Sequence, residues 1–153
     1  LVDGGTTPVI DGTNDFVYEL VGTAAALGTL DDAVLSTAIV AFDVTVDVVG
    51  GYVVQVFEDG NLRFGANVVD DVVDGTVTIG TEEYGGRSSD TTLAGSTFDT
   101  ADTAFTATFQ DVADEVGVSF ESRNFVTLKA SIDGTTQAGG YAQALSFIVS
   151  GNY

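Results

Sequence analysis

The clearest pattern along the chain is an alternation of apolar and polar positions within residues 39–58. Every second residue from Val40 to Val48 is a valine or a phenylalanine, and most residues between them are polar. Because successive side chains of a strand point to opposite faces, this spacing predicts a half-buried β-strand. Gly50-Gly51 then predicts a two-residue hairpin turn, and residues 52–57 read as the return strand. We therefore expect these two strands to pair.

Shorter stretches with the same alternation, or rich in β-branched and aromatic residues, recur along the chain. They predict strands at residues 16–21, 62–64, 67–73, 76–79, 105–109, 116–120, 126–132 and 141–149. Asp-Gly pairs recur between several of these stretches and favour tight turns. About nine or ten short strands at this spacing predict an all-β fold: a single antiparallel β-sandwich, either Ig-like or jelly-roll-like.

Four stretches lack the alternation and are expected to lie outside strands. Residues 1–13 predict an extended N-terminal arm preceding a sandwich domain of residues 14–153. Residues 24–35 predict a loop or a short helical turn. Residues 85–102, rich in Gly, Ser, Thr and Asp, predict a long surface loop, and residues 111–115 a charged turn.

The net charge of the chain limits the classes of partner that it is expected to bind. Four Lys and Arg residues stand against 23 Asp and Glu residues, a formal net charge of −19. Binding to nucleic acid or to an anionic membrane depends on cationic side chains, so both are disfavoured. The longest apolar stretches are far shorter than the roughly 20 residues of a spanning helix, so no membrane insertion is expected. The chain begins at Leu1, from which we expect a removed signal peptide or propeptide and a secreted protein at the cell surface. The alternative is that the sequence is a fragment of a longer chain.

The residue types that are missing argue against an enzyme. The chain has no His and no Cys, so it lacks the imidazole or thiolate that most nucleophilic and zinc sites require. A pair of carboxylates on one strand face, Asp43 and Asp47, remains as a glycosidase-like alternative. Their neighbours are those of an ordinary outward sheet face, so we expect no catalytic residue.

Two binding features are compatible with the sequence. Asp70, Asp71 and Asp74 lie near a turn and are candidate calcium ligands, since Ca²⁺ binds carboxylate and carbonyl oxygens. A solvated acidic turn is the competing interpretation in so acidic a chain. Tyr84 and Tyr141, each beside glycines, are either core residues or exposed contacts of a binding surface.

Three stretches carry a resemblance to known proteins. They are GTEEYGG at residues 80–86, the Thr37–Val54 stretch and TTQAGGYAQALSFIVSGNY at residues 135–153. Together they resemble secreted bacterial surface β-sandwich proteins of the filament and envelope type. The closing strand is distantly similar to spore-coat-U-like, chaperone–usher-related fibre subunits. The resemblance implies an envelope, adhesive or filament role and supplies no catalytic residues.

These observations predict a structural subunit of an extracellular filament or surface layer, with itself as partner. We expect assembly by strand addition, in which the N-terminal segment pairs with an open sheet edge or groove of the next copy. The residues expected to make this contact are Val9, Ile10, Phe16, Tyr18 and Leu20. The competing interpretation makes residues 14–21 the first strand of their own domain. The alternative function is a monomeric adhesive or carbohydrate-binding surface module, using the 85–102 loop, Tyr84 and calcium to hold glycans or a host surface.

Overall fold

The computed structural model describes residues 16–20 and 24–153, and within these ranges the protein contains strands and loops but no helix. The all-β class predicted from the sequence is confirmed. The strands are β1 (Phe16–Leu20), β2 (Ser36–Val46), β3 (Tyr52–Glu58), β4 (Arg63–Phe64), β5 (Asn67–Val68), β6 (Glu83–Ser88), β7 (Gln110–Glu115), β8 (Ser119–Ser131) and β9 (Leu145–Gly151). No helix of the described part is therefore long and apolar enough to cross a membrane.

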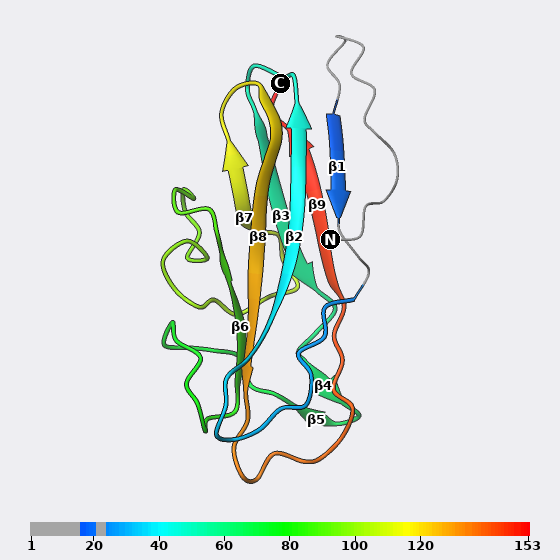
Figure 1. Cartoon of the computed structure of the whole chain (residues 1–153), viewed down its shortest axis with the longest axis vertical. Coiled ribbons are helices and arrows are strands. Elements are labelled where there is room, and N and C mark those ends of the chain that lie inside the picture. The colour runs from blue at the N-terminus through cyan, green and yellow to red at the C-terminus, as the bar shows by residue number, and fades with distance from the viewer. Residues whose placement is uncertain (1–15, 21–23) are drawn as a thin grey trace.

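The strands form two main antiparallel sheets and a small hairpin (Figure 1). The first sheet has the order β1-β2-β8-β6 and the second the order β7-β3-β9, while β4 and β5 pair with each other. We call the end that carries the C terminus in Figure 1 the upper end, and the end that carries β4 and β5 the lower end.

The core lies between the two main sheets. Alternate residues of β2 from Phe42 to Val46 are at most 1% exposed, as the alternation predicts. Alternate residues of β3 from Tyr52 to Val56 have no exposed surface, and Val126 of β8 is equally buried. All of them belong to one apolar cluster. The two sheets therefore pack their apolar faces on a shared core in a sandwich-like arrangement.

The hairpin predicted around Gly50-Gly51 is wrong, although both of its strands exist. β2 pairs with β1 and β8, whereas β3 pairs with β7 and β9 in the other sheet. Both strands bury an apolar face, so they face each other across the core instead of lying side by side. The glycines serve this crossing: a Cβ on Gly50 would lie 1.9 Å from the Asn152 carbonyl oxygen, and one on Gly51 would lie 1.7 Å from that of Glu115.

The predicted loop at residues 85–102 begins too early, because Gly85 and Gly86 belong to β6 and pair with β8. A Cβ on Gly85 would lie 2.5 Å from Val72 Cγ1, and one on Gly86 would lie 2.4 Å from Phe105 Cζ. These glycines therefore let neighbouring segments pack tightly against the strand. The glycines that suggested a loop are therefore the two residues of β6 without side chains.

Further boundaries differ from the sequence prediction. Residues 76–79 and 105–109 form no strand, and residues 111–115, predicted as a turn, belong to β7. Phe105 is 1% exposed although it lies in a loop, so its apolar character reflects the core and not a strand. The strands expected at 116–120 and 126–132 merge largely into the 13-residue β8. Residues 24–35 form a loop, one of the two alternatives.

One flank of β2 pairs with β8 along nearly its whole length, whereas the other flank is paired only in its upper part. Its upper part pairs with β1, from Phe16 opposite Val46 to Leu20 opposite Phe42. Residues 36–41 pair with β8 on one side and with no described strand on the other. β9 is likewise the last described strand of its sheet, with β3 on one side alone. On the same flank of the two sheets, two sheet edges therefore have no neighbour among the described strands (Figure 1).

Candidate functional site

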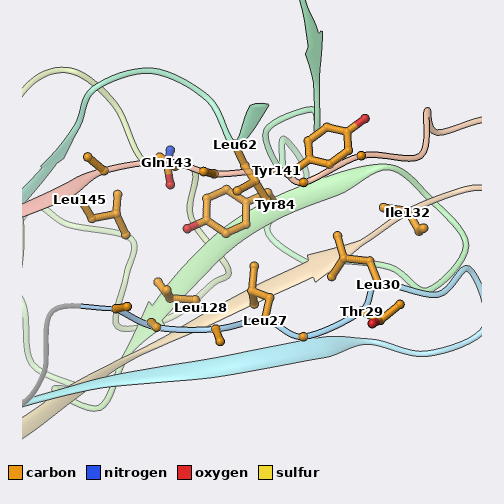
Figure 2. A pocket seen from close by; sticks show the side chains of 18 of the residues that line it. Leu27, Thr29, Leu30, Leu62, Tyr84, Leu128, Ile132, Tyr141, Gln143 and Leu145 are labelled. Atoms are coloured by element: carbon orange, nitrogen blue, oxygen red, sulfur yellow. The ribbon is translucent and has the colours of Figure 1, made fainter. Parts of the chain in front are cut away.

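A groove of about 960 Å³ lies between these two open edges. Residues 24–30 form one wall and residues 136–145 the other, with Val40 of β2 and Phe147 of β9 also among the lining residues. Figure 2 shows Leu27 and Leu30 pointing from the first wall into the groove, with Tyr84 and Leu128 close by. The lining is mainly apolar, so the groove is suited to apolar side chains.

The groove follows from the alternation of β9 and from the missing neighbour at its edge. Leu145, Phe147 and Val149 point inward and pack on the core, yet each remains half-buried. The Phe42 ring of the core lies 6.1 Å from the ring of Phe147, a residue that lines the groove. Inward-facing apolar residues of a central strand are normally covered on both sides, so this half-burial marks a position that a further strand would complete.

The wall formed by residues 24–30 does not complete either sheet. In the described part of the chain, none of these residues makes a backbone hydrogen bond to β2 or β9. Leu27 and Leu30 are half-buried against the core, whereas Ala24–Ala26 are exposed. Among the described residues, no strand pairs with residues 36–41 of β2 on this flank or with the outer edge of β9, so these are the edges that an incoming strand would use.

Polar groups are concentrated around Gln143. Its amide nitrogen donates to Glu58 and, over 2.9 Å, to the carbonyl oxygen of Gly60. Its Oε1 is buried without a hydrogen-bond partner among the described residues. A buried acceptor without a partner costs stability.

Burial also changes the acidity of two groups near Gln143. Glu58 is 7% exposed, and this burial, with the charges of Asp71 and Asp59, raises the pKa of its carboxyl. Burial likewise raises the pKa of the Tyr84 hydroxyl, so it stays protonated at neutral pH. Since the Gln143 Oε1 atom and nearly all of Tyr84 are buried, the groove presents mainly apolar surface.

The assembly residues predicted from the sequence fall into two groups. Phe16, Tyr18 and Leu20 belong to β1, which pairs with β2 of the same chain. The structure therefore places this segment as the first strand of its own domain, the competing interpretation given above. Val9 and Ile10 lie outside the described residues.

The residues of the alternative binding module are not brought together. Tyr84 is 2% exposed, so the prediction of an exposed contact is wrong for this residue. Tyr141 is half-buried and donates its hydroxyl hydrogen to the Gln137 carbonyl oxygen. Among the residues that the structure describes, no group of three or more Asp, Glu, His or Cys side chains is placed to hold a metal ion, and Asp70, Asp71 and Asp74 form no such group. Asp74 instead accepts a hydrogen bond from the backbone N–H of Thr76.

The four cationic side chains are engaged within the chain. Arg123 donates from Nε and Nη2 to the two carboxylate oxygens of Asp43, each over 2.7 Å. Arg63 pairs with Asp59 at 2.8 Å and Lys129 with Asp102 at 2.6 Å. Arg87 donates to the Asp99 carbonyl oxygen at 3.5 Å. Asp43, considered above as a candidate acid, is thus held in an ion pair on the sheet surface.

Several groove residues were missed from the sequence. The stretch from Ala24 to Leu30 has no alternation and predicts only a loop or helical turn, although its two leucines are the signal of a segment that covers apolar surface. Leu145 and Phe147 fell in a correctly predicted closing strand. The openness of that strand's edge has no signature in the sequence, because it depends on strand order.

Comparisons with known proteins add no family to this picture. A scan against protein-family models finds no match to this chain, and neither does a search of curated proteins. The function is therefore argued from the groove and from the two open sheet edges beside it.

Proposed function

We propose that this chain is a structural subunit of an extracellular filament or surface layer, in which residues 1–13 of one copy add a strand to the groove of the next. The observation that carries the proposal is the apolar groove between two unpaired sheet edges. An added strand gains main-chain hydrogen bonds from an edge and places alternate side chains in the groove. Val9 and Ile10 are adjacent, so one of them would face the groove and the other would face away.

The pairing of β1 limits which segment is donated. Residues 16–20 already complete the upper part of the chain's own β2 edge, so they act as the anchor of the arm. The donated segment is then the arm before them, which holds the apolar residues Val9 and Ile10. The donated segment is attached at Phe16, at the upper end of one copy (Figure 1). The groove that receives it lies in the lower half of the next copy, near β4 and β5. Such a head-to-tail contact does not close on itself and so generates a fibre.

The first experiment removes the arm. Chains lacking residues 1–13 should remain folded but stay monomeric by light scattering and show no fibres by negative-stain microscopy. A sharper version compares the double variant Val9→Asp/Ile10→Asp with the matched control Thr6→Asp/Thr7→Asp, which adds the same charge to the same arm. The first should abolish fibres and the control should keep them. Fibres of unchanged length after the deletion would rule out the arm.

A further inference from the structure

The upper end of the molecule exposes apolar side chains from three separate segments. Val49, Val116 and Tyr153 are 83%, 89% and 89% exposed, and Val118 and Phe120 are 56% and 66% exposed. We call these five residues the apolar tip. Figure 1 shows the β2–β3 and β7–β8 connections beside the C terminus at this end. A group of exposed apolar residues on so acidic a chain is a candidate interaction surface.

Gly50-Gly51 holds the three segments of the tip together. The Gly50 Cα faces the backbone of Asn152, and the Gly51 Cα faces that of Glu115 and Val116, at distances that leave no room for a Cβ. Asn152 also donates its backbone N–H to the Gly51 carbonyl oxygen over 2.9 Å. The tip is therefore fixed by close backbone packing and does not depend on one mobile turn.

The arm is attached beside this tip. Phe16 pairs with Val46, the last residue of β2 before the tip turn. Five residues separate Ile10 from Phe16, and at about 3.3–3.6 Å per residue they span at most roughly 20 Å. If Ile10 reaches the groove of a second copy, the short segment of residues 11–15 therefore brings the tip close to the lower half of that copy.

The lower half offers an apolar rim next to the groove. Phe64 and Val68 of the β4–β5 hairpin are 44% and 41% exposed. The Phe64 ring lies 6.1 Å from that of Tyr141, a groove-lining residue. The backbones of Arg63 and Ala142 exchange two hydrogen bonds, so the hairpin is fixed to the groove wall.

We infer that the apolar tip of one copy packs on the rim formed by Phe64, Val68 and Tyr141 of the next copy. The inference rests on the proposed function, since residues 11–15 bring the tip to this rim only when the arm lies in the groove. Contact between two surfaces of a chain with net charge −19 is opposed by charge repulsion, and apolar patches are where burial can offset it. The second copy thus covers both the groove and its rim.

The test uses Val116→Asp, with Val73→Asp as the matched control. Val73 is 90% exposed and belongs to neither the tip nor the rim, so both variants add one charge at an exposed valine. Neither substitution removes a buried contact, so both chains should fold with unchanged thermal stability. The tip variant should raise the critical concentration for fibre assembly about tenfold or more, because a carboxylate would be buried without a partner. The control should assemble as the native chain does.

A second measurement separates the tip from the arm. In the full-length Val9→Asp/Ile10→Asp chain, whose own arm is disabled, a fluorescent peptide of residues 1–15 reports groove binding by anisotropy. Adding Val116→Asp to this chain should leave peptide affinity unchanged. Peptide that binds while Val116→Asp chains polymerise as readily as the control would overturn the tip contact and leave strand addition standing. Peptide that does not bind at all would overturn strand addition and the tip contact with it.

Discussion

The two halves of β2 carry the same alternation but differ in how they are covered. In the upper half, Val44 and Val46 are fully buried, and the strand has neighbours on both sides. In the lower half, Ala38 and Val40 also face inward but are half-buried, and the groove lies beside them. The difference shows that an inward-facing pattern states which face a strand buries, whereas the neighbouring strands decide how completely it is buried.

The outer face of the same sheet shows the reverse distribution. In the upper half, Arg123 and Asp43 pair across β8 and β2 with 55% and 25% of their side chains exposed. In the lower half, Lys129 and Asp102 form an ion pair with 22% and 5% exposed. Asp102 also accepts a hydrogen bond from the Val77 backbone over 3.0 Å, so loops cover the sheet here. The lower half is thus closed on its outer face and open on its inner flank.

The largest expected effect tests the inner face. Phe42→Ala removes a ring that is 1% exposed and packs on Phe147, so it should lower the free energy of unfolding by about 4 kcal/mol. Val40→Ala, two residues along the same face, should cost about 1 kcal/mol because its side chain is already partly in solvent. Urea unfolding followed by fluorescence or circular dichroism measures both. Equal losses would show that the lower half packs as tightly as the upper half.

A smaller effect is expected on the outer face. Asp102→Ala leaves the partly buried Lys129 ammonium without its partner and the Val77 N–H without an acceptor, so it should destabilise the fold by about 3 kcal/mol. The matched variant Asp43→Ala breaks an exposed pair and should cost less than about 1 kcal/mol. Added salt should weaken the Asp43 contribution and leave that of Asp102 nearly unchanged. If both losses fall equally with salt, the loops do not shield Lys129 as described.

The fold class and the buried faces were predictable because they depend on local alternation. Residues 40–48 and 52–57 each specify an inward apolar face, and both strands exist where they were expected. Their pairing was not predictable from the glycines between them, since Gly50-Gly51 fits a hairpin turn and a crossing between sheets equally well. Glycines also obscured β6 in the sequence, because they suggested a loop although they leave space for Val72 and Phe105 to pack on the strand.

The location of the candidate site was not predictable from the sequence. The expectation of strand addition to an open edge stays a prediction, and the sequence did not indicate which edge an added strand would use. The groove is built from residues 24–30, 136–145 and parts of β2, β6, β8 and β9, which come together through strand order. The buried Tyr84 illustrates the limit, because its neighbouring glycines were compatible with either a core or a surface position.

Two adjacent carboxyls near the groove have pKa values that are shifted in opposite directions. Glu58 is buried and its pKa is raised above the ordinary 4.5, chiefly by loss of solvent. Asp59 lies at the surface, where hydrogen bonds from Arg63 and the Ala144 backbone lower its pKa from 3.8 to about 2. Glu58 thus lies on the buried side of this end of the groove, and Asp59 lies on its solvated side. The pH dependence of stability tests this difference.

The smallest expected effect is the pH dependence of stability at Glu58. Between 4.5 and its raised pKa, the folded chain binds this proton more tightly than the unfolded chain, so Glu58 makes stability fall as pH rises through that window. Glu58→Gln removes the ionised form and still accepts a hydrogen bond from Gln143. The variant should therefore be more stable than the native chain at pH 7, with the advantage shrinking toward pH 4. Asp59→Asn should show the opposite sign: less stable at pH 7, with the difference fading as pH falls from 3.8 toward 2. Thermal unfolding of the three chains from pH 2 to 8 measures both slopes, and a Glu58→Gln chain that parallels the native chain across this range would show that Glu58 remains solvated.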